Sequence, residues 1–169
     1  RVKLVEGDIL DRPTLEKAID GAGGVFHLAA SWLLQCVDEP RQGLQTNVVG
    51  TFNVMEACKQ AKVERLVFSS SASVYGEAEV FPTPEAHHHH FNDTFYGAAK
   101  SFDEGMARSF RAMRGLDYVA LRYFNVYGPR MDVFGKYTEV LIRWLECLDR
   151  GERPQIFGAR LGVAECAAL

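Results

Sequence analysis

The sequence lacks the features that mark membrane proteins, secreted proteins and nucleic-acid-binding proteins. Its apolar runs fall short of the roughly 18–20 residues of a membrane span, and its first residues contain no apolar signal segment. The net charge of −3 at pH 7 gives no reason to expect nucleic acid or an anionic membrane surface as a partner. We therefore expect a cytoplasmic protein.

The cysteines and histidines also lack the spacing of a metal site. The four cysteines are scattered with no CxxC pair, so we expect reduced thiols rather than a disulfide framework or a zinc site: Cys36, Cys58, Cys147 and Cys166. The run "EAHHHH" (Glu85–His90) does not change this expectation, because consecutive residues cannot all point at one ion. The sequence predicts a solvated loop here and no metal.

Apolar runs alternate with helical patterns along the whole chain. Its 169 residues are 47% hydrophobic and 24% charged, which is typical of one globular domain. The expected strands cover residues 2–6, 23–30, 65–71, 118–124 and 154–158, and the expected helices about 11–21, 40–61, 94–113 and 136–150. This alternation predicts an α/β fold with a parallel sheet covered on both faces.

In such sheets, ligands bind beyond the carboxyl ends of the strands, so the residues that follow each strand are the candidates for function. Asp8 could accept hydrogen bonds from an adenine or a ribose, or it could be a turn residue. The serines from Ser69 to Ser73 could hold a substrate hydroxyl, or they could make local backbone contacts. Asn125 could bond a ligand and Arg130 a phosphate, although Asn, Gly and Pro are also expected in turns.

The stretch "FYGAAK" places Tyr96 and Lys100 four residues apart in a helix-prone run. Residues at this spacing lie one above the other on a helix face, so the ammonium can lie beside the phenol. A nearby cation favours phenolate and lowers the pKa of a tyrosine from its reference value of about 10. The pair therefore predicts a general acid/base, although one such pair can also arise by chance.

Six motifs, in this order and spacing, resemble the extended short-chain dehydrogenase/reductases: "EGDILD", "VFHLAA", "TNVVGTFNVMEAC", "RLVFSSSASVYG", "FYGAAK" and "LRYFNVYGPR". The resemblance is strongest to their NAD-dependent nucleotide-sugar epimerase/dehydratase branch and spans Val2 to Gly158. It implies a doubly wound, Rossmann-like sheet, NAD as cofactor and a nucleotide-diphosphate sugar as substrate. It also implies a homodimer through the helices at 40–61 and 94–113.

The resemblance implies a role for each motif residue. The catalytic residues would be Ser71, Tyr96 and Lys100. The cofactor would be held by Asp8, Ile9, Leu28, Ala29, Ala30, Asn47, Ser69, Tyr96, Lys100 and Phe124, with Asp8 and Ile9 at the adenine end and Phe124 near the nicotinamide. The substrate would contact Ser71, Asn125 and Arg130.

The residues after Ser71 distinguish the branches of this family. The 4,6-dehydratases that the chain resembles carry an Asp-Glu pair just after the catalytic Ser or Thr, and the decarboxylases keep the Glu; this chain has Ala72 and Ser73. The difference favours 4-epimerisation or simple oxidoreduction. A dehydratase or reductase of the same family, or a non-catalytic NAD(P)-binding module, remain alternatives.

The family's glycine-rich phosphate loop has no counterpart after Arg1, so we expect it upstream and interpret the fold as N-terminally truncated. We expect residues 1–157 to form a partial NAD-binding domain with the start of the substrate lobe. Residues 158–169 would form a divergent tail.

Overall fold

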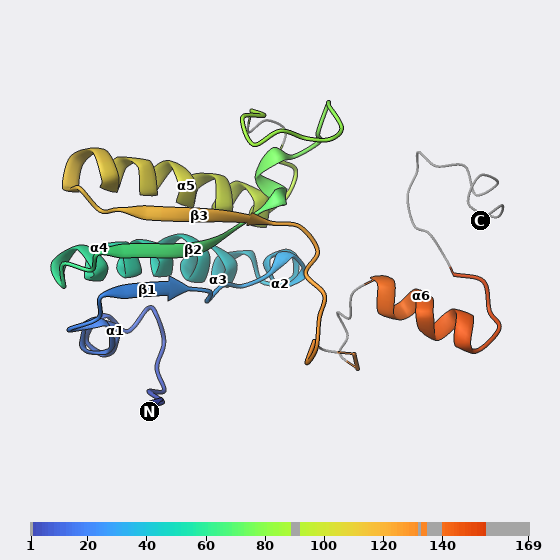
Figure 1. The fold of residues 1–169 in the computed structure, drawn as a ribbon, viewed down its shortest axis with the longest axis horizontal. Coiled ribbons are helices and arrows are strands. Elements are labelled where there is room, and N and C mark those ends of the chain that lie inside the picture. The colour runs from blue at the N-terminus through green and yellow to red at the C-terminus, as the bar shows by residue number, and fades with distance from the viewer. Residues whose placement is uncertain (1, 89–91, 132, 135–139, 155–169) are drawn as a thin grey trace. The chain divides into compact units, whose positions relative to one another are not determined.

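Three parallel strands, in the order β1-β2-β3, form the sheet of the chain (Figure 1). They are β1 (Gly24–His27), β2 (Arg65–Ser71) and β3 (Tyr118–Tyr123). The pairing runs from Gly24 opposite Arg65 and from Leu66 opposite Tyr118. The predicted α/β fold with a parallel sheet is confirmed, although β1 ends at His27, three residues before its expected end.

The structure is a computed structural model that describes residues 2–88, 92–131, 133–134 and 140–154. It divides into two units, Arg1–Phe124 and Asn125–Leu169. The first unit holds the sheet, and the second holds helix α6 (Val140–Asp149). The expected strand at 154–158 and the boundary at 157 lie almost wholly outside the described residues, so the predicted domain division stays a prediction.

The helices of the first unit largely follow the predicted ranges. They are α1 (Arg12–Ile19), α2 (Leu33–Asp38), α3 (Pro40–Leu44), a π-helical segment (Gln45–Gly50), α4 (Thr51–Gln60), a 3₁₀ helix (Ala72–Tyr75) and α5 (Phe95–Arg114). The helix expected at 40–61 is thus one helical path whose middle turn is widened, and α2 was not predicted. The long α5 begins where the Thr94 side chain accepts the Gly97 N–H at 3.0 Å and ends at Gly115, which has a φ of 66°.

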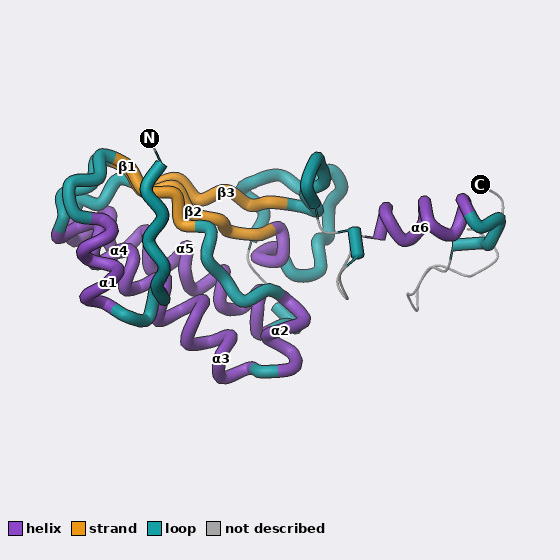
Figure 2. Tube along the Cα trace, turned by 90° about the horizontal axis from the view of Figure 1, so that it is seen from below, coloured by secondary structure: helices purple, strands orange, loops and turns teal. Residues whose placement is uncertain are grey.

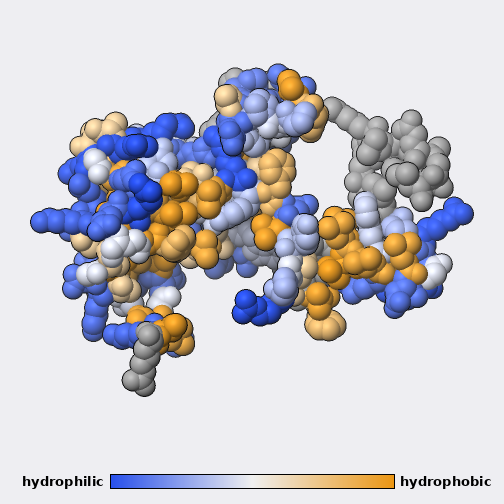
Figure 3. Space-filling model, in the orientation of Figure 1, coloured by the Kyte–Doolittle hydropathy of each residue, from blue (hydrophilic) through white to orange (hydrophobic). Residues whose placement is uncertain are grey.

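Among the described residues of the first unit, the helices lie on one face of the sheet (Figure 2), whereas the sequence led us to expect helices on both faces. The two crossovers β1-α4-β2 and β2-α5-β3 advance in the same direction across the sheet. Because such crossovers are right-handed, they place their helices on the same side. The opposite face, which is turned toward the viewer in Figure 3, exposes apolar side chains, including Phe26 (77% exposed), Val119 and Leu121.

The core lies between the sheet and its helices. Its buried members come from α1, α4, β2, α5 and the turns beside them: Ile19, Val54, Met55, Ala57, Cys58, Val63, Leu66, Phe68, Ala107 and Leu116. Alternate residues of β2 point into this core, and the pattern continues to Ser70, the buried residue next to the predicted catalytic Ser71.

The strand expected at residues 2–6 is wrong. The segment has no regular structure, and Val2 and Leu4 are 97% and 93% exposed. A strand is stabilised by the backbone hydrogen bonds of a neighbour, and none of the strands in the described ranges pairs with this segment. Its β-prone sequence is therefore not sufficient to form a strand here.

Two smaller expectations can be compared with the structure. Cys36, Cys58 and Cys147 are free thiols, as predicted, and Cys166 lies outside the described residues. Within the described part of the chain, no helix combines the length and apolarity that crossing a lipid bilayer requires.

Candidate functional site

The structure brings the predicted catalytic residues together at the carboxyl end of β2. Ser71 is the last residue of this strand, and Tyr96 and Lys100 lie in the first two turns of α5. The Lys100 ammonium nitrogen lies 5.7 Å from the centroid of the Tyr96 ring. Ser71 lies within reach of the Tyr96 phenol, so that hydrogen bonding between them lowers the pKa of the phenol. A hydroxyl, a phenol and an amine therefore share one site.

Ser71 is oriented by its own chain. Its hydroxyl oxygen accepts the Ser73 N–H at 3.1 Å and caps the 3₁₀ helix that follows β2. The side chain also donates to the Ser73 hydroxyl at 3.1 Å. These contacts fix the Ser71 rotamer beside Tyr96, as the local-contact interpretation of the serine run predicted. Local bonding and a position in the site are compatible.

Lys100 is held by the strand rather than by the phenol. Its ammonium donates to the backbone carbonyl of Ser69 at 2.8 Å, and the residue is only 3% exposed. Burial lowers the pKa of Lys100, while the nearby Asp103 and Cys36 act in the opposite direction. Ser69, a predicted cofactor residue, thus contacts Lys100 through its backbone carbonyl.

The pKa of Tyr96 contradicts the expectation from the sequence. Burial raises this pKa above its usual value, and the hydrogen bond with Ser71 only partly opposes the shift. The reason is that the phenol is partly buried, while Lys100 directs its nitrogen at the Ser69 carbonyl. The spacing of four residues correctly predicted that Tyr96 and Lys100 lie close together. It did not predict that burial outweighs charge in setting the pKa of Tyr96.

Two buried ionisable residues near Lys100 were missed by the sequence reasoning. Asp103 is fully buried, and among the described residues its carboxylate oxygens have no hydrogen-bond partner. Burial raises the pKa of Asp103 to about 8, although Lys100 lowers it. His27 shares a 3.0 Å hydrogen bond with the Thr51 hydroxyl, and burial lowers its pKa to about 4. The spacing of Asp103, three residues after Lys100, could have placed it on the same helix face.

A buried ion pair was also missed, and it joins α5 to both neighbouring strands. Glu104 accepts two hydrogen bonds from the Arg122 guanidinium, at 2.9 and 2.7 Å, and one from the Ser70 hydroxyl at 2.6 Å. The Arg122 guanidinium also lies 4.8 Å from the Tyr75 ring centroid. This network holds the helix that carries Tyr96 and Lys100 against the strand that carries Ser71.

The predicted brace Asn47 organises the loop after β1. Its amide accepts the Ser31 N–H at 2.7 Å and donates to the Ser31 carbonyl at 2.8 Å, and the residue is fully buried. In the following helix, Asn53 donates to the Ile9 carbonyl at 3.1 Å. The π-helical segment and α4 thus tie down the loops at Ile9 and Ser31, both of which the sequence placed near a cofactor.

The remaining predicted cofactor residues lie on exposed loops. Asp8 makes a local turn in which its carboxylate accepts the Leu10 N–H at 2.9 Å. Leu28, Ala29 and Ala30 follow β1 and are exposed. Their binding roles stay predictions.

The last three predicted site residues fall at and beyond the end of the first unit. Phe124 is the final residue of that unit and is 69% exposed. Asn125 and Arg130 belong to the second unit. Their substrate-binding roles therefore also stay predictions.

Comparison with known proteins gives the family of the chain. Residues 1–163 match the family described as "NAD dependent epimerase/dehydratase family". A UDP-glucose 4-epimerase of Azospirillum brasilense is 39% identical over 134 residues, which cover 75% of this chain and 37% of that protein.

Solved structures agree in both sequence and shape. The UDP-N-acetylglucosamine 4-epimerase of Methanobrevibacter ruminantium, in complex with UDP-N-acetylmuramic acid, is 37% identical with a TM-score of 0.82, over 92% of this chain and 50% of that one. The UDP-glucose 4-epimerase of Thermus thermophilus, in complex with NAD, is 32% identical with a TM-score of 0.74, over 86% of this chain and 48% of that one. The chain spans about half the length of these relatives or less. On the match over residues 1–163, it belongs to the NAD-dependent epimerase/dehydratase family.

Proposed function

We propose that this chain carries the catalytic residues of an NAD-dependent 4-epimerase that acts on a UDP-sugar. The proposal rests on one observation: Ser71, Tyr96 and Lys100 lie close together at the carboxyl end of β2. Membership of the family and the likeness to several UDP-sugar 4-epimerases support the choice of reaction and substrate class.

The residues present fit NAD in the chemistry of their donors. Lys100 donates one N–H to the Ser69 carbonyl and has two further N–H groups that can donate to a ribose hydroxyl. The exposed Asp8 carboxylate suits an adenine amine or a ribose hydroxyl, and the small side chains of Ala29 and Ala30 leave room beside the strand end. When bound, NAD supplies the site that accepts a hydride from the sugar and returns it, so it is not consumed.

Each catalytic residue then has a distinct task. Tyr96 takes the proton from the C4 hydroxyl of the sugar and returns it at the end of the reaction. Ser71 hydrogen-bonds the same sugar oxygen and holds it beside the phenol. Lys100 binds the ribose and supplies positive charge beside Tyr96. Because burial raises the pKa of Tyr96, the phenol must first release its own proton to solvent, and the positive charge of Lys100 stabilises the phenolate that then accepts the proton of the sugar hydroxyl.

The residues after Ser71 favour epimerisation over dehydration. Eliminating water from the sugar needs an extra acid and base near the reacting carbons. Ala72 has no ionisable group, and the Ser73 hydroxyl is engaged with Ser71 at 3.1 Å. We therefore expect the product to keep every atom of the substrate.

The test is 4-epimerase activity of the complete gene product on UDP-glucose and UDP-N-acetylglucosamine with NAD. Tyr96→Phe removes the proton-transfer group and should lower kcat by about 10²–10⁴-fold. Tyr118→Phe is the matched control, because Tyr118 is the first residue of β3, at the opposite end of the sheet from Ser71. Equal activity of the two variants, or a dehydrated product, would overturn the proposal.

A further inference from the structure

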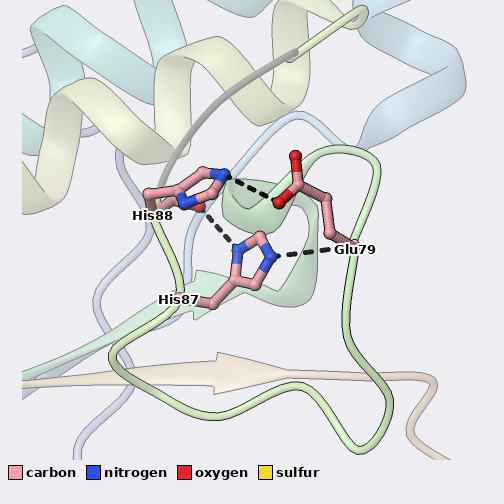
Figure 4. Close-up of side chains that lie close together, drawn as sticks. All are labelled: Glu79, His87 and His88. Atoms are coloured by element: carbon pink, nitrogen blue, oxygen red, sulfur yellow. Dashed lines mark hydrogen bonds and ion pairs between the residues drawn. The ribbon is translucent and has the colours of Figure 1, made fainter.

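Three side chains of the loop between β2 and α5 converge in a way that neither the catalytic site nor the fold explains. Glu79, His87 and His88 each direct a potential ligand atom inward, and these atoms lie within 4.8 Å of one another (Figure 4). The sequence predicted no metal here, because consecutive histidines cannot all point at one ion and no carboxylate at a matching spacing accompanies them. The structure adds Glu79 from the opposite side of the loop.

The two hydrogen bonds of His87 fix its tautomer. Its Nδ1 lies 2.8 Å from the His88 carbonyl oxygen, which can only accept, so Nδ1 carries the proton. Nε2 is then the lone-pair nitrogen, and it accepts the Glu79 N–H at 3.4 Å. That second bond is longer than the usual 2.7–3.2 Å and therefore weak. In metal-ligating histidines, one ring nitrogen coordinates the metal and the other donates its N–H to a group such as a backbone carbonyl. His87 has this arrangement.

The other two ligands are close to the spacing that a metal requires. His88 Nε2 lies 3.8 Å from Glu79 Oε2. Zinc bonds of 2.0–2.1 Å in a tetrahedron place ligand atoms about 3.3 Å apart. This pair must therefore approach by about 0.5 Å (3.8 − 3.3). Because all three ligand atoms lie within 4.8 Å of one another, no pair needs to approach by more than about 1.5 Å. Both side chains are solvent-accessible, at 44% for His88 and 60% for Glu79, so a cation can reach them and they can adjust.

The rest of the loop gives the site a fixed base. His87 is only 9% exposed, and its ring meets the Tyr75 ring edge-on with centroids 5.9 Å apart. Arg122 of β3 donates to the Glu85 carbonyl at 2.7 Å. The least exposed ligand, His87, thus packs on the 3₁₀ helix, and its loop is tied to β3.

From this geometry we propose that Glu79, His87 and His88 form a binding site for a divalent cation of the zinc type. Two imidazoles and one carboxylate suit Zn²⁺, whereas Ca²⁺ and Mg²⁺ prefer oxygen ligands throughout. Water completes the coordination. The ion crosslinks the two sides of the loop that follows Ser71 and is a structural ion, since none of its ligands is a catalytic residue.

The test is calorimetric titration of the metal-free complete gene product with zinc chloride and, separately, with calcium chloride. One zinc ion per chain and no calcium binding are expected. Glu79→Gln should weaken zinc binding at least 10-fold, and because Glu79 is exposed this variant keeps the fold, which circular dichroism checks. The double variant His89→Ala and His90→Ala, in the same histidine run, should leave the affinity unchanged.

The opposite pattern overturns the proposal. If the double variant loses zinc and Glu79→Gln does not, the histidine run binds the ion as an unstructured peptide would. Absence of zinc binding by the unaltered protein also overturns it. Neither result bears on the proposed epimerase activity, which is measured separately.

Discussion

Asp103 is a carboxyl group placed where its charged form is unfavourable. Burial raises its pKa to about 8. Between about pH 4 and pH 8 the folded chain therefore keeps a proton that the unfolded chain has lost, and this group makes the fold less stable as the pH rises through that window. The same shift leaves Lys100 beside a largely neutral partner at neutral pH.

We predict that Asp103→Asn removes this dependence. Relative to the unaltered protein, the variant should gain more than about 1 kcal/mol of unfolding free energy between pH 5 and pH 8, the equivalent of about one pKa unit. Urea unfolding at the two pH values measures it. The pKa of His27 is lowered to about 4, so between that pH and its usual pKa this group makes the fold more stable as the pH rises. Both proteins contain His27, so comparing them cancels its contribution. An unchanged pH dependence would contradict the assignment.

Gly97 follows Tyr96 and allows α5 to approach the 3₁₀ helix closely. A Cβ at this position would lie 2.9 Å from the Ser73 carbonyl oxygen and 2.5 Å from Asn92 Oδ1. Contacts this short force the first turn of the helix to move, and Tyr96 moves with it.

We predict that Gly97→Ala lowers both stability and activity, the latter at least tenfold. Gly105→Ala on the same helix is the control, because its Cβ would meet nothing nearer than 3.8 Å. That change should stabilise the protein by about 0.5–1 kcal/mol through helix propensity. Urea unfolding and the epimerase assay distinguish the two, and similar behaviour of both variants would contradict the close-approach argument.

At the scale of elements, α5 is held in place by charge as well as by packing. Glu104 and Arg122 have side chains only 6% and 19% exposed and form a double hydrogen bond between helix and strand. Hydrogen bonding to Glu104 raises the pKa of Arg122 further above its usual value. The network therefore sets how the catalytic helix lies on the sheet.

We predict that Glu104→Ala lowers the free energy of unfolding by about 3–5 kcal/mol, because it leaves a partly buried guanidinium without its carboxylate. Arg65→Ala is the matched control. Arg65 pairs with Asp117 and also joins β2 to the start of β3, but this ion pair is exposed. The loss of unfolding free energy in Arg65→Ala should therefore be much smaller. Chemical denaturation measures both. Equal losses would show that burial of the Glu104 pair contributes little.

The elements also show what sequence patterns can and cannot predict. The strands at 65–71 and 118–124 and the helix at 94–113 were predicted nearly to the residue, because their apolar patterns coincide with clear ends such as Thr94 and Gly115. The strand at 2–6 was wrong because strand formation depends on a neighbour that local sequence does not reveal. The pKa of Tyr96 and the burial of Asp103 depend on side chains from several elements, and helix spacing alone cannot predict them.

At the scale of the molecule, α4 and α5 expose apolar side chains, among them Phe52 and Phe102. A groove of about 800 Å³ runs between the π-helical segment, α4 and α5, and Val48, Phe52, Phe102 and Phe110 contribute to its lining. Phe102 is 57% exposed and also lines the neighbouring groove against α3. This surface fits the homodimer that the family resemblance implied.

We predict a dimer that Val49→Asp disrupts, because Val49 lines this groove and is 44% exposed. Val80→Asp is the control, a similarly exposed valine (55%) in the loop after β2. Sedimentation velocity on the complete gene product should show a dimer for the control and a monomer for Val49→Asp. A dimer in both variants would place the interface elsewhere, and a monomeric unaltered protein would contradict the prediction.

The proposed function requires that Ser71, Tyr96 and Lys100 support reversible hydride removal at C4 of a UDP-sugar. The most direct measurement is the NMR spectrum of UDP-glucose incubated in D₂O with NAD and the complete gene product, beside Tyr96→Phe. A hydrogen that leaves and returns as hydride does not exchange with solvent, so the 4-epimer should form without deuterium at C4, and Tyr96→Phe should form almost none. Deuterium at C4, or undiminished product from Tyr96→Phe, would contradict the account.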